Sequence, residues 1–346
     1  MSIHHLTGLY MGAYANLPVF LAVMFGLFAV LAYAFACVKQ RRLLAAWRDV
    51  RDAVAPATLY RTLTVRFDIK IFWFQLLFVT PAVAFVGSLY SAERLAKLLI
   101  AAHGAPAISL GGHPIAATLF QVFASQILGT FGAFLFHYAG HKTPLFWSLH
   151  KVHHSAEALS PFTAARGHPI DTLLGGSISF VWRTLVVGVA LYVTGGAFTP
   201  IALTILGLLG MATLIQDALN HSHVPLSYGW FNRLWVGPLF HHVHHSADLK
   251  HRDKNFGGGV PVWDWLFGTM YLPDPDEALR LGLNDAEIGE ANPHNTVRGY
   301  MIEPMAEFAR ELLRLVRGLG THTTFPPTTI AAADAGAGRE GGVCPP

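Results

Sequence analysis

The sequence has few charged residues and almost no cysteine. Of its 346 residues, 13% are Asp, Glu, Lys or Arg and 53% are hydrophobic, whereas a soluble domain carries about 25% charged residues. The two cysteines, Cys37 and Cys344, are far apart, which excludes a disulfide framework and a CxxC metal or redox site. The net charge is only +3 and no basic stripe or binding motif is present, so no nucleic acid is expected as a partner. The composition indicates a membrane protein. Because cysteine is nearly absent, any metal site in it must depend on histidine.

Histidines are concentrated in two stretches of the chain. Five lie within the eighteen residues 137–154, at the helical offsets i,i+4 and i,i+3,i+4, which place imidazoles on one helix face. Thr143-Pro144 separates the two sets, and a Thr cap followed by Pro predicts that one helix ends near His141 and the next begins at Pro144. The same His-x-x-His-His pattern returns after Gly237-Pro238, and a His-x-His pair precedes it. The candidate metal ligands are His137, His141, His150, His153, His154, His221, His223, His241, His244 and His245.

So many imidazoles exceed the needs of one zinc or one haem. The eight histidines of the three principal sets suffice for two metals with three or four nitrogens each. Imidazole suits iron, zinc, copper and nickel alike, so the ligand type leaves the metal open. A site beside a membrane, reached by lipid and by dioxygen, favours redox-active iron.

Five apolar runs are long enough, or nearly so, to cross a bilayer with a core of about 30 Å. They are residues 17–38, 71–90, 115–136, 177–194 and 198–216. Gly195-Gly196 and Pro200 mark a turn between the last two, which therefore form a hairpin. Arg183 lies inside the fourth run, and we expect its side chain to snorkel to the interface. The expected fold is an all-α, multi-pass integral membrane protein with a cytosol-facing, histidine-rich metal domain.

The distribution of basic residues predicts the orientation. With the N-terminus outside, the segments 39–70, 137–171 and 218–346 are cytoplasmic and carry 8, 3 and 10 Lys or Arg residues. The outer segments carry only Arg94 and Lys97. The positive-inside rule thus predicts that all histidine sets face the cytoplasm, in a bacterial inner membrane or the endoplasmic reticulum.

The chain is divided on these patterns into four regions. Residues 1–114 form an N-terminal region with two spans, and residues 115–273 hold the histidine sets and an aromatic-rich segment. Residues 274–317 form a cytoplasmic region that includes an amphipathic helix at 303–317, suited to a membrane interface. Residues 318–346 are rich in Gly, Ala, Thr and Pro, which predicts a disordered tail.

The order HYAGH, eight residues, HKVHH, a hydrophobic hairpin and HHVHH resembles the fatty acid hydroxylase/sterol desaturase superfamily of membrane histidine-box enzymes. The stretches HHSAEALSPFTAARGHPID and NFGGGVPVWDWLFGTMY also resemble its bacterial sterol-desaturase-like members, so the resemblance covers about 115–273. It implies a di-iron centre held by the eight box histidines. His221 matches a further family histidine, whereas His223 stands where relatives often have another residue. His168 matches a family position and is assigned a second-shell or structural role.

The resemblance implies a lipid hydroxylase or desaturase that uses two iron ions and O2, with no catalytic residues beyond the metal ligands. The chain has neither an HPGG haem motif nor a Gly-rich nucleotide fingerprint. We therefore expect no bound haem or flavin, and an external electron donor of ferredoxin or cytochrome b5 type with its reductase. The alternatives left open are a metal-transport or metal-sensing membrane protein, a bis-histidine haem carrier and an inactive family member.

The remaining histidines are isolated in the sequence. We expect them to be exposed or singly hydrogen-bonded, without a role in the metal site. They are His4, His5, His103, His113, His251, His294 and His322.

Overall fold

The computed structural model describes residues 17–41, 43–44, 46–106, 108–284 and 292–318. Within these ranges the chain is built from helices and loops, and its β-structure is limited to an isolated bridge between Ser246 and Leu281. The predicted all-α class is confirmed. The expected disordered tail lies, apart from its first residue, outside the described residues.

The α-helices are α2 (Leu17–Gln40), α3 (Trp47–Val54), α4 (Ala57–Tyr60), α5 (Leu63–Phe74), α6 (Thr80–Ser88), α7 (Ala92–His103), α8 (Pro114–Gln126), α9 (Phe131–Lys142), α10 (Pro144–His154), α11 (Pro169–Val193), α12 (Pro200–Asn220), α13 (Pro238–His244), α14 (Val262–Phe267), α16 (Val297–Met301) and α17 (Glu303–Val316). Connections are mostly short up to α10, and longer segments follow α10, α12, α13 and α14. A π-helical segment, Gln75–Val79, joins α5 to α6. Short 3-10 helices cover Leu128–Thr130, Thr163–Ala165, Gly229–Arg233, Leu249–His251 and Pro293–Asn295.

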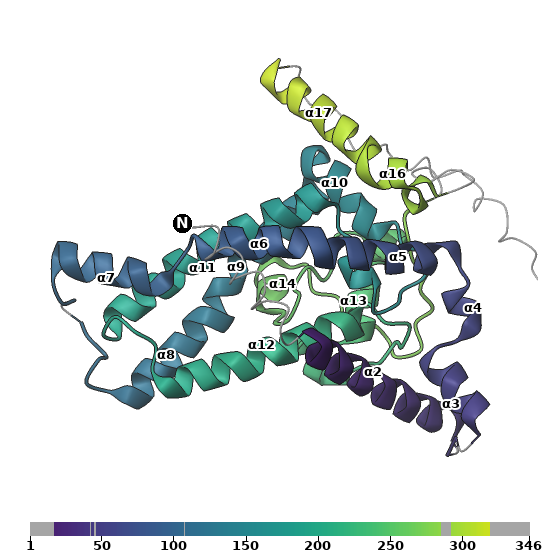
Figure 1. The fold of residues 1–346 in the computed structure, drawn as a ribbon, viewed down its shortest axis with the longest axis horizontal. Helices are drawn as coiled ribbons and strands as arrows, with labels where there is room; N and C mark the ends of the chain where they lie inside the picture. Colours follow the sequence, from purple (N-terminus) through teal and green to yellow (C-terminus); the bar gives the residue numbers. More distant parts are fainter. Residues whose placement is uncertain (1–16, 42, 45, 107, 285–291, 319–346) are drawn as a thin grey trace, which may run out of the picture.

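Among the described residues, five helical stretches are long and apolar enough to cross a membrane, as expected for a multi-pass membrane protein. They are 21–40, 63–103, 114–142, 169–193 and 200–220. Each contains or largely overlaps one of the predicted apolar runs. In Figure 1, α7 and α8 lie at one end of the molecule, and α10 and α13 lie in the half towards α3 and α4.

Two of these stretches differ from the predicted runs. The second extends well beyond 71–90, because Ser91 caps a new helix by accepting a hydrogen bond from the Arg94 backbone N–H. Arg94 and Lys97 therefore lie on α7 rather than in a loop. The third is interrupted by the 3-10 turn at Leu128–Thr130, so α8 and α9 are separate helices.

Helix α11 lies at the centre of the packing of the long helices, since it contacts α6, α7, α8 and α9. Its contact with α9 is very close at Gly132, where an added Cβ would lie 2.6 Å from Cβ of Trp182. Only glycine allows that approach. The contact fixes α9, which carries the first two histidines, against the span.

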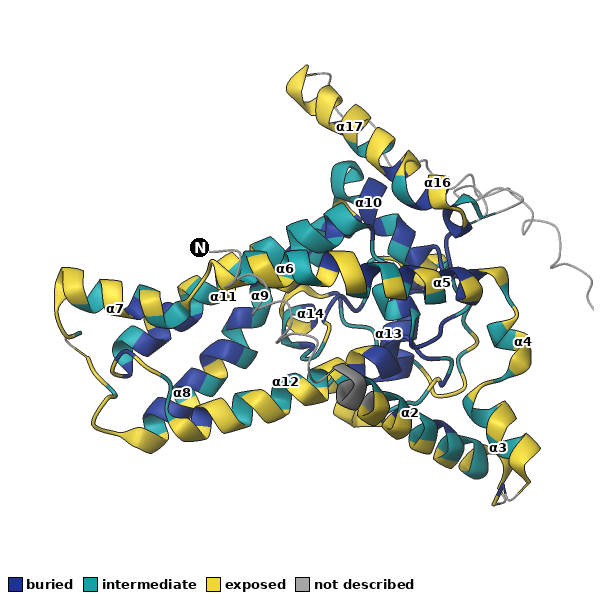
Figure 2. Cartoon of the chain, in the orientation of Figure 1, coloured by how far each residue is buried: buried dark blue, intermediate teal, exposed yellow. Residues whose placement is uncertain are grey.

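The surface of the long helices is apolar. Figure 2 shows extended exposed segments on α7, α12 and α17, whereas α13 is buried along its length. Exposed large side chains on these spans include Phe78, Leu98, Leu203 and Leu208. Lipid is the solvent that suits such a surface.

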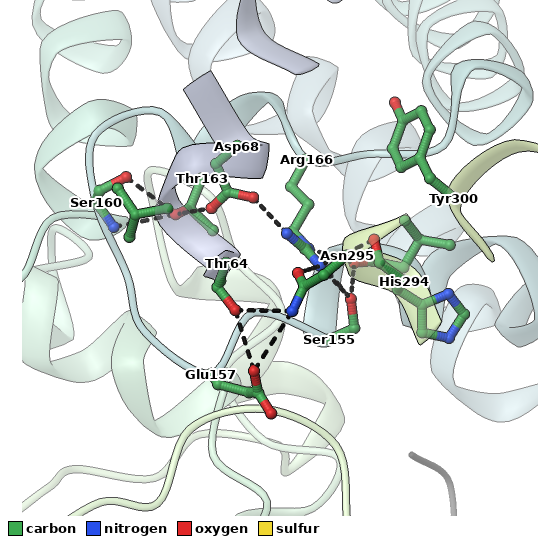
Figure 3. Close-up of polar contacts among 12 residues, drawn as sticks. Thr64, Asp68, Ser155, Glu157, Ser160, Thr163, Arg166, His294, Asn295 and Tyr300 are labelled. Atoms are coloured by element: carbon green, nitrogen blue, oxygen red, sulfur yellow. Dashed lines mark hydrogen bonds and ion pairs between the residues drawn. The ribbon is translucent and has the colours of Figure 1, made fainter. Parts of the chain in front are cut away.

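A buried polar network around Arg166 joins three distant segments (Figure 3). The guanidinium of Arg166 is fully buried and forms an ion pair with Asp68 of α5. It also donates to Oδ1 of Asn295 at 2.7 Å and to Oγ of Ser155, just after α10, at 3.0 Å. The network therefore fixes the end of α10 against α5 and the C-terminal region.

The amphipathic helix predicted at 303–317 is α17. It packs on α10, and an ion pair between Lys151 and Glu307 joins the two helices. The apolar side chains of Leu312, Leu313 and Val316 stay exposed. Figure 1 shows α17 projecting from the body of the molecule beyond α16.

Candidate metal centre

The first two histidine sets are presented by α9 and α10, which meet at a sharp corner. The side chain of Thr143 caps α10 by accepting a hydrogen bond from the Phe146 backbone N–H, and Pro144 occupies the first turn. The helix break predicted between His141 and Pro144 is confirmed. Gly140 lets the two helices approach, because a Cβ there would lie 3.2 Å from Cγ of His150.

The third set is presented by α13, which begins at Pro238 as the sequence predicts. All seven of its residues are buried. His221 lies at the C-terminal end of α12, one residue beyond the helix proper. The hairpin of α11 and α12 therefore brings the chain back to the same side of the bundle as α9 and α10, and the sets meet.

Nine of the ten predicted ligands form two groups, and within each group the candidate ligand atoms lie within 4.8 Å of one another. The first group is His137, His141, His150, His154 and His244. The second group is His153, His221, His241 and His245. The groups adjoin, since the rings of His154 and His245 are stacked with centroids 4.7 Å apart.

The His-His pair that ends each His-x-x-His-His pattern is divided between the two groups. His153 belongs to the second group and His154 to the first, while His244 belongs to the first and His245 to the second. Neighbouring helical residues point in directions about 100° apart, whereas residues at i,i+4 share a face. The pattern His-x-x-His-His thus supplies both groups from a single helix.

The geometry of both groups fits metal coordination. Nε2 atoms approach at 3.0 Å between His141 and His154, and at 3.1 Å between His241 and His245. Two imidazole nitrogens at right angles on one metal, each about 2.1 Å from it, are separated by about 3 Å. The buried Nε2 atoms of His137, His150 and His244 have no hydrogen-bonding partner. Buried polar atoms are rarely left unpaired without a functional reason.

Outer partners orient several of the rings. Nδ1 of His150 lies 2.9 Å from Oδ2 of Asp171, which is buried in the first turn of α11. In three more histidines, Nδ1 lies 2.7–2.9 Å from a backbone carbonyl oxygen that accepts its hydrogen bond. They are His137, His221 and His244. A ring that donates through Nδ1 presents the lone pair of Nε2 to the centre. These partners select the tautomer that binds metal.

Burial keeps His153, His154, His241, His244 and His245 neutral. Desolvation lowers the pKa of His153, His154, His241 and His245 well below 6.5, and neighbouring imidazoles lower it further. Desolvation also lowers the pKa of His244, to about 3. Neutral imidazole is the form that coordinates metal, so the site is prepared for metal at neutral pH.

His223, predicted as a ligand, lies apart from both groups. Its Nε2 lies 3.2 Å from the Ala53 carbonyl oxygen, and its ring packs edge-on against Phe28 of α2. The reason is the loop after α12, which turns the chain between His221 and His223 so that only His221 faces the centre. His168 instead caps α11, because its Nδ1 accepts a hydrogen bond from the Ile170 backbone N–H at 3.2 Å. Its role is structural, within the expectation from the sequence.

Two isolated histidines are buried: His251 departs from the expectation because it has two partners, whereas His294 meets it with a single ring hydrogen bond. His251 contacts both Oγ of Ser246 and Oε1 of Glu277, at 2.9 and 3.1 Å. His294 contacts the Gly299 carbonyl at 2.7 Å. His103 and His113 are exposed as expected. The other three isolated histidines, His4, His5 and His322, lie outside the described residues.

The segment after α13 closes the centre. The Phe256 carbonyl accepts the hydrogen bond from His137, and the Phe256 ring packs against those of His137, His141 and His244. The buried carboxylate of Asp264 holds this turn by accepting from the backbone N–H groups of Phe256 and Gly257, both at 2.7 Å. The aromatic-rich segment is thus part of the wall of the metal centre.

Two cavities reach the histidines from different sides. A cavity of about 570 Å³ lies between the α8–α9 region, α11, α12 and the segment 256–263, and His137 and Asp217 are among its lining residues. A second cavity of about 80 Å³ reaches His141, His154 and His244 beside Asp253. Arg183 was expected to snorkel to the interface. Its side chain is exposed and lines the larger cavity beside the 3-10 turn between α8 and α9.

The fatty acid hydroxylase family model matches residues 122–269, a range that holds both histidine groups. The match covers somewhat less than half of the chain. The superfamily resemblance seen in the sequence is therefore confirmed. No solved structure matches the chain.

Curated relatives in this superfamily include enzymes named for lipid oxidation. The chain is 28% identical over 192 residues to the ornithine lipid hydroxylase OlsE of Rhizobium tropici, covering 54% of this chain and 53% of that protein. It is 26% identical over 151 residues to human alkylglycerol monooxygenase, covering 42% and 30%. Identity to the very-long-chain aldehyde decarbonylase GL1-11 of Oryza sativa subsp. indica is 32% over 153 residues, covering 43% and 52%. The chain thus spans about half, or less, of the length of these relatives.

Several residues that support the histidine groups were not singled out in the sequence. Asp171 and Arg166 both lie in the stretch that resembled the family, but only its histidines were assigned roles. A signal for Asp171 was present, since it is an acidic residue in the first turn of an apolar span. The partner of Arg166, Asp68, is nearly a hundred residues away, and no local pattern connects them.

Proposed function

We propose that the chain is a membrane di-iron oxygenase that hydroxylates or desaturates a lipid, using O2 and electrons from a separate donor. The observation that carries this proposal is the pair of adjoining histidine groups, with five and four candidate ligands. One metal would be held by the first group and the second by His153, His221, His241 and His245. The names of the relatives, which include a lipid hydroxylase and a monooxygenase, support oxidation of a lipid over other metal chemistry.

Two iron ions in such a site would supply the electrons and the oxidising power needed to break an unactivated C–H bond. The chain's own residues prepare the site. Asp171 and the carbonyl of Phe256 fix the orientation of His150 and His137. The apolar spans admit the lipid laterally to the larger cavity, and the ring of Phe256 excludes water from the first group.

The electron donor would be a ferredoxin or a cytochrome b5 with its reductase, approaching from the cytoplasmic side. The excess of basic residues in the segments that adjoin the histidines supports this orientation. The membrane would be a bacterial inner membrane or the endoplasmic reticulum. No bound haem or flavin is required by the proposal.

Replacement of His153 tests the proposal. We expect His153→Ala to lose metal from the second group and to lose lipid oxidation, because that group has only four candidate ligands. His103→Ala is the matched control, since His103 is exposed on α7. The readouts are iron per chain and incorporation of ¹⁸O from ¹⁸O2 into lipid, or loss of two hydrogens, by mass spectrometry with a donor system.

Full metal loading and activity in His153→Ala would overturn the assignment. A protein that holds metal, oxidises no lipid and moves the metal across vesicles would instead establish the transport alternative. A Soret band in the visible spectrum would establish a haem carrier. Each result separates one of the classes that the histidine pattern left open.

A further inference from the structure

Arg183 is the basic residue of the larger cavity, and it lies deep in a span. It is fourteen residues from the start of α11 and ten from its end, or at least about 15 Å from either terminus at 1.5 Å per residue. Within the described part of the chain, its guanidinium has neither a hydrogen-bonding nor an ion-pair partner. A charge in this position costs roughly 2.5–3.5 kcal/mol on insertion scales and usually marks a function.

The stem of Arg183 is held in place by the neighbouring turn. A Cβ on Gly129 would lie 3.3 Å from Cγ of Arg183, so the 3-10 turn between α8 and α9 packs directly on the side chain. The glycine makes room for the arginine. The 3-10 turn that interrupts the third span therefore contacts the stem of Arg183, although the side chain as a whole stays exposed towards the cavity.

Gln126 lines the same cavity from the last residue of α8. Among the described residues, its side-chain amide also lacks a hydrogen-bonding partner. The hydroxyl of the adjacent Thr130 is already engaged, since it donates to the Ile127 carbonyl and accepts from Nε1 of Trp263. The cavity thus contains two free sets of N–H donors, a guanidinium and an amide, on facing helices.

These donors are separated from the metal centre by the length of a lipid segment. His137 is eight residues beyond Gly129 in the same run of helix, which corresponds to about 12 Å at 1.5 Å per residue. His137 and Asp217 line the cavity together with Arg183 and Gln126. A carbon beside His137 and a group beside Arg183 would therefore be some eight to ten carbons apart on an extended chain, at about 1.25 Å per bond.

We propose that Arg183, assisted by Gln126, binds an oxygen acceptor on the lipid substrate, either a carboxylate or an ester or amide carbonyl. The acceptor would lie about 12 Å from the carbon that is oxidised. The guanidinium fork matches such oxygens and is less strongly hydrated than an ammonium group, which suits it to a site within the membrane. This proposal rests on the proposed function and narrows its substrate class. Arg183 is a specificity-determining residue, distinct from the metal ligands.

Ligand binding to the metal-free, full-length protein in nanodiscs tests this proposal. Trp235 and Trp263 line the cavity, so their fluorescence reports occupancy. Three ligands of equal chain length are compared: a fatty acid, its methyl ester and the alkane. We expect the acid or the ester to bind at least tenfold more tightly than the alkane. Preference for the acid alone identifies a carboxylate, and equal binding of acid and ester identifies a carbonyl.

Variants assign the preference to residues. Arg183→Met is expected to lower affinity for the preferred ligand tenfold or more and to leave the alkane unchanged, while Arg183→Lys restores part of the loss for the acid. Gln126→Leu should produce a smaller loss. Arg94→Met is the control, since Arg94 is exposed on α7 and does not line the cavity.

Equal binding of all three ligands to the wild-type protein, or an undiminished preference in Arg183→Met, would overturn the proposal. If the helical circular dichroism signal of Arg183→Met showed that this variant does not fold, the proposal would be tested by two other measurements. These are the affinities of the wild-type protein for the three ligands and the affinity of Arg183→Lys for the acid. The binding assay needs no iron and no turnover. A protein that shows the preference but oxidises no lipid would therefore refute the proposed function and leave this inference intact.

Discussion

The Asp171 carboxylate orients His150 from within the first turn of α11, with Oδ2 2.9 Å from Nδ1 of the ring. Asp171→Ala removes that acceptor, so the imidazole loses its preference for the tautomer that presents Nε2 to the first group. Loss of such an outer partner typically weakens metal affinity 10- to 100-fold, or about 1.4–2.7 kcal/mol. Asp171→Asn keeps an acceptor oxygen but not the charge, and we expect a loss below tenfold.

The assay is a chelator competition that measures the iron bound per chain at each free-metal concentration. Asp171→Ala should show one weakened site and one site of wild-type affinity, because the second group takes none of its ligands from α9 and does not include His150. Asp276→Ala, which removes an exposed carboxylate, is the control. Equal affinities of Asp171→Ala and the wild-type protein at both sites would refute the role of Asp171, and equal weakening of both would refute the division into two groups.

Three further predictions concern the ligands and the network that supports them. Burial lowers the pKa of His244 from 6.5, its usual value in an unfolded chain, to about 3 in the fold, so the unfolded chain binds more protons between these two pH values. The metal-free protein should therefore lose stability as the pH falls below 6.5, by about 2 kcal/mol at pH 5 from this group alone; a melting temperature unchanged between pH 7 and pH 5 would contradict this. Asp68→Ala leaves the Arg166 guanidinium buried without its counter-ion, and thermal unfolding should show a loss of about 3–5 kcal/mol, whereas a wild-type melting curve would show that the pair is dispensable. His223→Gln should keep the full metal content, because His223 faces the Ala53 carbonyl rather than either group; loss of a metal ion would restore His223 as a ligand.

The fold class and most of the ligands follow from the sequence, because both depend on local patterns. Apolar runs of about twenty residues predict the spans, and the i,i+4 spacing predicts which imidazoles share a helix face. The Thr143-Pro144 break predicted the corner between α9 and α10 correctly, since a cap and a proline act within one turn. The division of His153 and His154 between two groups follows from the 100° step of the helix, but only once a second helix is known to face them.

The rest depends on contacts between distant segments. His221 and His223 are two residues apart, and only the turn after α12 decides that one faces the centre and the other faces α2. The Arg166–Asp68 pair joins residues nearly a hundred positions apart. The sequence shows Arg183 only as a charge within a span, and its place in the cavity became evident only from the packing of its stem against Gly129. No periodicity in the sequence encodes these neighbours.

The two adjoining histidine groups are proposed to hold two metal ions. The most direct test is the metal content of detergent-purified, iron-supplied protein, with Mössbauer spectroscopy on the same sample. We expect about two irons per chain in a magnetically coupled pair, as ligand counts of five and four allow. A single metal per chain, or zinc that iron does not replace, would contradict it.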